Sequence, residues 1–276
     1  MAAADKVLPQ PFYLNSRFYK RDCMKTMCAI IIAMPFCVCS FAAPVAQDFG
    51  SNYGAGNPWT TGATGGYGFG SWTITAVQGS GYAGAFIGDP SFGGIYGMSA
   101  SSFGLYANPL SSGASVDVDR PFSAALQVGE TFSFLWGVNC DTDGGNKGFN
   151  IYTGGTGGTQ LFNVNQAGFP GPITFNGADC NLAYGQTAMV WRIKLTTTSN
   201  LQITSTDRNG GTAAAFTTNI TVSAAPDAFR WYCSQMGSGD QRQPYFNNLQ
   251  IDPVPEPTAL LTLVAGALGW FACRKH

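Results

Sequence analysis

The chain has 276 residues, and its composition is glycine-rich and poor in charge: 36 residues are glycine and only 11% are charged. The formal net charge is −1 and no basic patch could neutralise a run of phosphates, which argues against a nucleic acid partner. The only histidine is His276, so histidine-based catalytic triads and histidine metal sites are excluded from the preceding chain in their usual forms.

The N-terminal region carries a secretory signal, predicted over residues 24–42. Lys25 precedes an apolar run from residue 27 to residue 38, and small residues follow, which are the three parts of such a signal. Cleavage is expected after Ala42; a cut after Ala43 would place a proline next to the scissile bond, which suits signal peptidase poorly. Signal peptidase is therefore an expected partner during export.

Four regions are predicted from these signals. Residues 1–23 fit no signal design and are interpreted as a non-native extension, with Met24 as the true start. The signal peptide covers residues 24–42, an exported domain covers residues 43–252, and a C-terminal segment covers residues 253–276. Between the signal and the apolar tail, thirteen acidic residues against seven basic ones give a net charge of −6, so the exported part is acidic.

The exported domain is predicted to be all-β. Short apolar–polar alternations are separated by clusters of Gly, Asn and Asp, and no long window shows helical periodicity. About nine to twelve strands in one domain predict a single β-sandwich of jelly-roll type. In "FRWYC", Phe229, Trp231 and Cys233 should face one side, and Arg230 and Tyr232 the other. The predicted strands are 71–77, 130–138, 148–152, 160–165, 189–196, 201–206, 216–223, 228–233 and 245–251.

Three cysteines remain in the exported domain, which permits one disulfide and one free thiol. An oxidising compartment favours a bridge, and Cys140 with Cys180 is the predicted pair because both flank acidic loop-like segments. Cys233 lies in an apolar strand and is predicted to be a buried thiol.

"CDTDGGNKG" is a weak candidate for a calcium loop. Asp141, Asp143 and Asn146 offer hard oxygen ligands on a glycine-rich segment, as calcium prefers. It is not an EF-hand, because Tyr152 stands where that loop needs its bidentate Glu. A solvated turn between strands is the commoner role of such a sequence, and no cofactor is otherwise expected. The two aspartates could also serve a hydrolase, but nothing singles them out, and no catalytic residue is assigned.

Aromatic side chains offer a second candidate site. Trp59 lies in the glycine-rich "GNPWTTG", with Tyr53 and Tyr67 near it, and these three could stack on sugar rings. Packing within the loop is the commoner role. The other tryptophans of the domain lie in alternating strands, where core packing is expected.

The chain ends with "VPEP", an apolar stretch from Thr258 to Cys273, and a basic tip. As a helix this stretch would reach roughly 24 Å, short of a bilayer core of about 30 Å, so it is marginal as a permanent anchor. The pattern resembles the PEP-CTERM sorting signal of Gram-negative bacteria, with Trp270 and Cys273 as mild departures. The residues that match its motif and basic cluster are Pro255, Glu256, Pro257, Arg274 and Lys275. The resemblance implies processing by an exosortase, often in strains that make exopolysaccharide.

A second resemblance covers residues 48–252. "GYGFGSWTI", "GAFIGD", "SFGLYAN", "DRPFSAALQVGETFSF" and "PYFNNLQI" occur in an order similar to that of exported bacterial sandwich domains related to concanavalin-like jelly rolls. This resemblance implies a fold and a location, and no established activity.

Two functions follow as hypotheses. The first is a non-enzymatic cell-surface or extracellular-matrix protein of biofilms, held transiently at the inner membrane and then released to the surface. The second is a carbohydrate-binding module for exopolysaccharide, with or without calcium.

Overall fold

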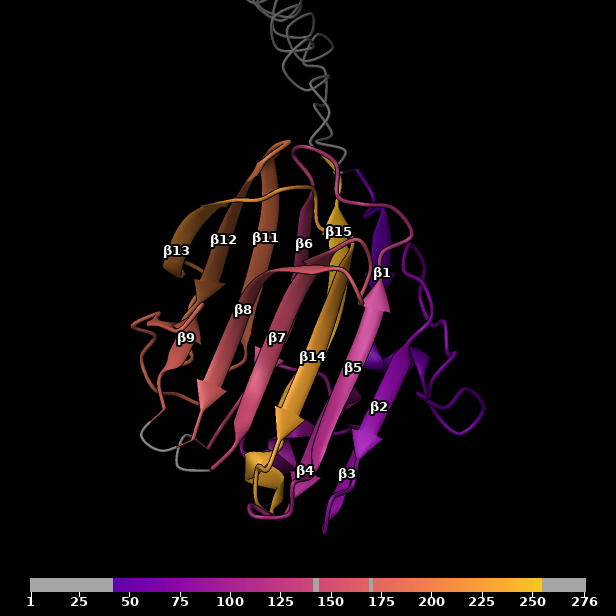
Figure 1. The fold of residues 1–276 in the computed structure, drawn as a ribbon, viewed down its shortest axis with the longest axis vertical. Coiled ribbons are helices and arrows are strands. Elements are labelled where there is room, and N and C mark those ends of the chain that lie inside the picture. Colours follow the sequence, from indigo (N-terminus) through magenta and orange to yellow (C-terminus); the bar gives the residue numbers. More distant parts are fainter. Residues whose placement is uncertain (1–41, 141–143, 169–170, 255–276) are drawn as a thin grey trace, which may run out of the picture. The chain divides into compact units, whose positions relative to one another are not determined.

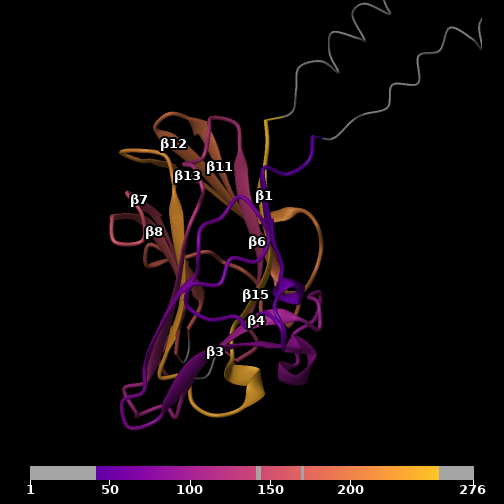
Figure 2. The same cartoon turned by 90° about the vertical axis from the view of Figure 1, so that its right-hand side faces the viewer.

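The structure, a computed structural model that describes residues 42–140, 144–168 and 171–254, contains two antiparallel β-sheets packed face to face (Figure 1). The view along the layers shows the two sheets edge-on (Figure 2). The all-β prediction is confirmed. Helix in the described ranges is limited to short 3-10 segments: η1 (Gly50–Asn52), η2 (Pro90–Gly93) and η3 (Asp240–Arg242). None of the described residues forms a helix with the length and apolar character needed to cross a membrane.

One sheet has eight strands in the order β13-β12-β11-β6-β15-β4-β3, and β1 pairs with β15 beside this path. The first strand and the last therefore lie side by side, with Ala46 opposite Ile251. The strands of this sheet are β1 (Ala46–Asp48), β3 (Tyr82–Gly88), β4 (Ser102–Asn108), β6 (Thr131–Gly137), β11 (Met189–Thr197), β12 (Asn200–Thr206), β13 (Ala214–Thr221) and β15 (Tyr245–Asp252).

The other sheet has seven strands in the order β10-β9-β8-β7-β14-β5-β2. All nine predicted segments form strands, but the described residues contain fifteen strands rather than nine to twelve. The additional ones are β1, β3, β4, β5, β9 and β10. The strands of this sheet are β2 (Thr73–Val77), β5 (Ser115–Pro121), β7 (Asn146–Thr153), β8 (Thr159–Ala167), β9 (Ile173–Phe175), β10 (Ala178–Asp179) and β14 (Ala228–Ser234).

The core between the sheets is aromatic. Alternation along β14 buries Phe229, Trp231 and Cys233, as predicted, because successive side chains of a strand point to opposite faces. The Trp231 ring stacks on Phe246 of the opposite sheet with centroids 4.4 Å apart. Trp136 stacks on the same Phe246 ring at an interplanar angle of 8°. Aromatic pairs add about 0.5–1.5 kcal/mol each beyond their buried area. The Trp231–Phe246 contact therefore helps to join the two layers, whereas the Trp136–Phe246 contact lies within the eight-stranded sheet.

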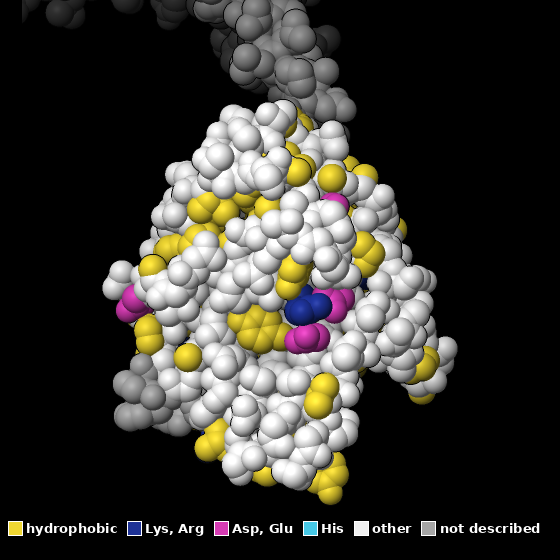
Figure 3. All heavy atoms as spheres, in the orientation of Figure 1, with side chains coloured by type: hydrophobic (Ala, Val, Ile, Leu, Met, Phe, Trp, Pro, Cys, Tyr) yellow, Lys and Arg dark blue, Asp and Glu magenta, His cyan; other side chains and the backbone are white. Residues whose placement is uncertain are grey.

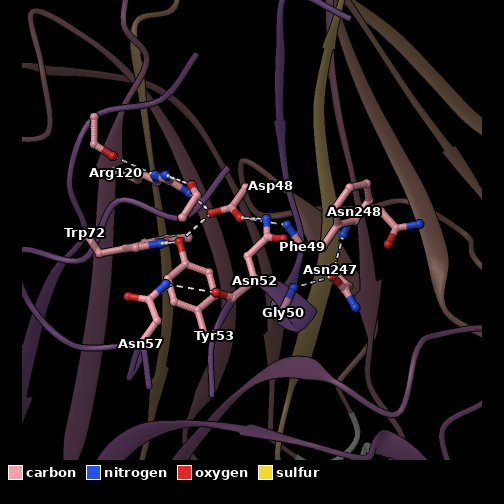
Figure 4. Close-up of polar contacts among 12 residues, drawn as sticks. Asp48, Phe49, Gly50, Asn52, Tyr53, Asn57, Trp72, Arg120, Asn247 and Asn248 are labelled. Atoms are coloured by element: carbon pink, nitrogen blue, oxygen red, sulfur yellow. Dashed lines mark hydrogen bonds and ion pairs between the residues drawn. The ribbon is translucent and has the colours of Figure 1, made fainter. Parts of the chain in front are cut away.

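A fully buried ion pair joins Asp48 of β1 to Arg120 of β5 inside the sandwich (Figure 4). Both side chains are fully buried, and a buried charge is tolerated only when it is paired and hydrogen-bonded. Asp48 also accepts hydrogen bonds from the Tyr53 hydroxyl (2.6 Å) and from Asn52 Nδ2 (2.7 Å). The Tyr53 hydroxyl in turn accepts from Trp72 Nε1 (2.7 Å).

The guanidinium of Arg120 is satisfied on its remaining sides by the glycine-rich segment before β2. Its Nε and Nη2 donate to the carbonyls of Gly70 and Gly65, each at 2.8 Å. Gly66 between them has φ 72°, and a Cβ there would lie 2.1 Å from the Gln47 carbonyl oxygen, so only glycine fits. The network therefore fixes residues 48–72 against both sheets.

Candidate functional site

The outer face of the seven-stranded sheet carries polar and aromatic side chains across four adjacent strands. The antiparallel register places Arg230 of β14 between Asp119 of β5 and Asn150 of β7. Asn163 of β8 is paired with Asn150 on its other side. Cross-strand neighbours on one face lie within contact distance, so these side chains form one surface. We call this surface the sheet-face cluster; it consists of Asp117, Asp119, Asn150, Tyr152, Asn163, Asn165, Arg230 and Tyr232.

Tyr232 lies across the sheet rather than standing away from it. Its register partner on β7 is Gly148, and a Cβ on Gly148 would lie 2.8 Å from the Tyr232 hydroxyl oxygen. That hydroxyl accepts from Asn163 Nδ2 (2.8 Å) and donates to Asn165 Oδ1 (2.9 Å). Burial raises the pKa of Tyr232 to about 12, so the phenol is neutral at physiological pH. The half-buried ring is therefore held in one orientation by the hydrogen bonds of its hydroxyl.

Arg230 joins two carboxylates of β5. Its Nε lies 2.8 Å from Asp119 Oδ1 and its Nη2 3.2 Å from Asp119 Oδ2, which is a bidentate pair. Its Nη1 lies 3.2 Å from Asp117 Oδ2. Figure 3 shows this face, where a basic group lies between acidic groups and beside hydrophobic side chains near the middle of the sheet. Two carboxylates and one guanidinium leave a single negative charge here.

The exposure of the two carboxylates differs. Asp119 is 7% exposed and Asp117 is 42% exposed at the side chain. Burial raises the pKa of Asp117 above its ordinary value, Arg230 opposes that rise, and the charge of Asp119 adds to it. Asp117 is therefore the carboxylate of the cluster that can accept a hydrogen bond from a ligand.

Asparagine amides and a second tyrosine continue the cluster across β7. Asn150 Nδ2 donates to the Tyr152 hydroxyl (3.1 Å), and Asn163 Nδ2 donates to Asn150 Oδ1 (2.7 Å). The Arg230 guanidinium carbon lies 5.7 Å from the centre of the Tyr152 ring. Asn150 and Tyr152 are themselves buried, so the accessible part of the cluster here is the Tyr232 ring with the Asn163 and Asn165 side chains. An aromatic ring beside amides suits a ligand with many hydroxyl groups.

The predicted aromatic site is not formed. Trp59 is only 6% exposed and packs on Trp72 and Phe103 at centroid distances of 5.4 and 4.8 Å. Tyr53 is 5% exposed and belongs to the buried Asp48 network, so neither ring can stack on a sugar. Tyr67 is 50% exposed, and its hydroxyl donates to the Pro44 carbonyl. Arg120 binds the carbonyls of Gly65 and Gly70 further along this glycine-rich segment, which helps to hold the segment against the sandwich.

The predicted bridge between Cys140 and Cys180 is not present between these two described residues. Cys180 is a buried free thiol whose side chain packs in the core, where burial raises its pKa to about 12. Cys233 is a buried thiol, as predicted.

Of the three predicted calcium ligands, only Asn146 lies within the described residues. Asp141 and Asp143 lie outside them. Asn146 begins β7, and its Oδ1 accepts from Asn165 Nδ2 at 2.9 Å. No group of three or more His, Cys, Asp or Glu side chains suited to a metal ion occurs in the ranges that the structure covers. Calcium in this loop stays a prediction.

The predicted processing residues are mostly beyond the described ranges. Ala42 and Ala43 are exposed and precede β1. The signal peptide and the residues of the sorting motif and basic tip (Pro255, Glu256, Pro257, Arg274 and Lys275) lie outside the described residues.

Sequence reasoning missed the sheet-face cluster. It placed Arg230 and Tyr232 on one face of their strand, which the structure confirms. The alternation of "SVDVDR" was a further available signal, since it puts Asp117 and Asp119 on one face. The pairing of β14 with β5 and β7 joins residues more than 60 positions apart, and no local pattern reports it.

Comparisons with known proteins add only a broad likeness of fold. No family model matches the sequence, and a comparison with curated proteins gave no match. Among solved structures, the T. cruzi calreticulin globular domain aligns with TM-score 0.44 and 10% identity, over 71% of this chain and 90% of that chain. The Ca²⁺/Man3GlcNAc-bound VIP36 exoplasmic/lumenal domain aligns with TM-score 0.39 and 8% identity, over 65% and 84%. A legume lectin-like domain from Entamoeba histolytica aligns with TM-score 0.37 and 13% identity, over 60% and 87%. Such distant likenesses carry no functional information, so a function must come from this chain's own side chains.

Proposed function

We propose that this protein is an exported, non-enzymatic carbohydrate-binding protein, and that it holds a polysaccharide chain against the sheet-face cluster. The observation that carries the proposal is Tyr232, laid over Gly148 with its hydroxyl bonded to Asn163 and Asn165. A ring fixed in this way gives an apolar platform for one face of a pyranose at little cost in side-chain entropy.

The polar groups around the platform suit sugar hydroxyls. Asn163 Nδ2 is occupied by Asn150 and Tyr232, so Asn163 offers its Oδ1 as an acceptor. Asn165 Nδ2 has a second hydrogen to donate beside the one bonded to Asn146. Asp117 and Arg230 can bind a pair of neighbouring hydroxyls, one as acceptor and one as donor. Arg230 is already paired with two carboxylates, so a polyanionic chain would meet net negative charge on this face. The proposed ligand is therefore a neutral polysaccharide.

The setting of this binding follows from the sequence signals. A signal peptide and a tail that resembles the PEP-CTERM pattern support delivery by signal peptidase and exosortase to the cell surface or matrix, where exopolysaccharide would be available. The domain between these signals would then retain polysaccharide in the matrix. A purely structural or adhesive role is the alternative, supported by the glycine-rich and weakly charged composition.

A glycan-array screen of the full chain, with and without a chelator, tests the proposal. We expect neutral polysaccharide fragments to be retained and uronic-acid polymers to be excluded. Tyr232→Ala should weaken retention about tenfold, whereas Tyr232→Phe should keep most of it, because stacking on an aromatic ring is worth about 1 kcal/mol or slightly more. Tyr67→Ala is the matched control, since it removes an exposed tyrosine outside the cluster. Absence of glycan binding in both conditions would contradict the carbohydrate-binding proposal and favour the structural or adhesive role.

The screen also separates binding from hydrolysis. Retained fragments should be recovered uncut. Turnover that ceased on Asp141→Asn or Asp143→Asn, or on Asp117→Asn, would replace the binding proposal with an aspartate-based hydrolase.

A further inference from the structure

A groove of about 460 Å³ lies on the outer face of the eight-stranded sheet, at β3, β4 and β15 and beside η2 and η3. Four aromatic side chains line it: Phe86, Phe92, Tyr106 and Tyr245. This surface belongs to the opposite sheet from the sheet-face cluster, and none of its lining residues is shared with that cluster.

Cross-strand glycines set the positions of these rings. Gly104 of β4 lies opposite both Phe86 and Tyr245 in the register, and a Cβ on Gly104 would lie 2.3 Å from Phe86 Cζ. Tyr106 lies opposite Gly84, where a Cβ would lie 2.7 Å from the Tyr106 hydroxyl oxygen. The missing side chains let the rings lie down over the sheet, so the groove has an aromatic floor.

The ring planes on this floor are inclined to one another. The centroids of Phe86 and Tyr245 are 5.7 Å apart with an interplanar angle of 83°, and those of Phe86 and Tyr106 are 6.1 Å apart at 50°. Phe92 of η2 stands at the rim with 79% of its surface exposed. A large apolar side chain so exposed beside an aromatic groove suits a ligand that covers it.

The charge of the groove is negative. Asp89 and Asp240 are among its nine lining residues, and none of the nine is basic. Arg242 lies two positions beyond Asp240, but its guanidinium is beside Gly237, outside the lining. The pKa of Tyr245 is raised to about 12, by burial first and then by the charges of Asp240 and Asp89, so both carboxylates act on the groove.

We propose that this groove binds a quaternary ammonium group, as in choline. Cations are attracted to the faces of aromatic rings, and two carboxylates at the rim add to that attraction. A quaternary head carries methyl groups that pack on the rings. A primary ammonium would instead lose strongly bound water. Phosphocholine carries the same head, but its phosphate would be repelled by Asp89 and Asp240.

Saturation-transfer NMR on the full chain, with choline as the probe, tests this site. We expect choline to bind about tenfold more tightly than its neutral isostere 3,3-dimethylbutan-1-ol, since that ratio corresponds to a cation–π and carboxylate contribution of about 1.4 kcal/mol. Choline should also bind more tightly than phosphocholine. Equal binding of choline and the isostere would show an apolar groove without cation selectivity and would overturn the proposal.

Variants locate the binding. Phe92→Ala should weaken choline binding about three- to thirtyfold, the range that aromatic–cation contacts produce. Asp89→Asn with Asp240→Asn should reduce the preference for choline over the isostere and should keep the η2 cap, because Asn caps as well as Asp.

Tyr82→Ala, which removes an exposed aromatic side chain of β3 outside the groove, is the matched control and should leave choline binding unchanged. Binding that persists in Phe92→Ala, or is lost equally in Tyr82→Ala, would contradict the assignment. Tyr232→Ala should not alter it, which separates this site from the proposed polysaccharide site.

Discussion

At the scale of single residues, the buried Asp48–Arg120 pair is the contact whose loss should cost most. Asp48→Asn leaves the Arg120 guanidinium inside the sandwich without its counter-charge, although Trp72 and Phe69 still lie 4.5 and 5.0 Å from it. Breaking one side of a buried pair costs about 3–5 kcal/mol, so we expect that loss in the free energy of unfolding. Urea unfolding followed by tryptophan fluorescence measures it.

The control for this substitution is Arg192→Met on β11, which removes an exposed guanidinium. It should change the free energy of unfolding by no more than about 0.5 kcal/mol. If Asp48→Asn were as mild as this control, the network of Figure 4 would not hold residues 48–72 in place.

Tyr232 should make the stability of the protein depend on pH in the alkaline range. Its pKa is raised from an ordinary 10.0 to about 12 by burial, so the unfolded chain loses this proton first as the pH rises. The native state then binds more protons than the unfolded state between pH 10 and 12, and stability must fall with pH across that window. Tyr232→Phe removes this titration. We expect the variant to lose less stability than the wild type between pH 9 and pH 11, measured by urea unfolding at each pH.

A parallel test on Tyr245→Phe guards against a general alkaline effect. Tyr245 has a similarly raised pKa of about 12, so Tyr245→Phe should also lose less stability than the wild type as the pH rises from 9 to 11. Identical pH dependence in the wild type and in Tyr232→Phe would mean that the Tyr232 phenol is as accessible in the native state as in the unfolded one.

At the scale of elements, β7 depends on Gly148. A Cβ at this position would lie 2.0 Å from the Val164 carbonyl oxygen of β8 as well as against the Tyr232 hydroxyl. Gly148→Ala must therefore push β8 or Tyr232 away, and overpacking of this kind costs about 1–3 kcal/mol. We expect that loss in urea unfolding, together with weaker polysaccharide retention. Gly157→Ala is the control: nothing lies within 4 Å of its added Cβ, and it should be close to neutral.

The same glycines explain which elements could be predicted from sequence. β11 and β14 alternate cleanly, and their segments were predicted within one or two residues. β3 and β4 were missed because Gly84, Gly88 and Gly104 interrupt the apolar–polar period, although each of these glycines has a ring laid over it. β9 and β10 have three and two residues and are too short for a periodic signal.

The sheet-face cluster shows more clearly what could not be predicted from the sequence. That Tyr232 and Arg230 share a face follows from alternation, but that Tyr232 lies over Gly148 follows from a register between strands distant in the chain. Likewise, the interior charge of Arg120 gives no local sign of its partner Asp48, 72 positions away. Its glycine-rich surroundings predict exposure of Trp59, yet the ring packs on Trp72 and Phe103, and Gly65 and Gly70 further along the same segment bind the buried guanidinium.

At the scale of the whole molecule, the described residues begin and end side by side, at the same end of the fold (Figure 2). β1 pairs with β15, so the chain enters beside the strand by which it leaves, and every strand of both sheets lies between residues 46 and 252 (Figure 2). The predicted signal peptide and sorting tail lie outside that range. Removal of both should therefore leave all strand pairings in place.

We accordingly expect residues 43–254 to fold without the flanking segments. Urea should unfold this fragment in one cooperative transition, with coincident changes in tryptophan fluorescence and circular dichroism. Trp59, Trp72, Trp136, Trp191 and Trp231 all lie in its core, so fluorescence reports on both sheets. A fragment that bound ANS, or gave two separate transitions, would show that the flanking segments contribute to the sandwich. Cooperative unfolding would instead mean that the proposed cleavages, by signal peptidase and by an exosortase, would leave a domain that folds without its flanking segments.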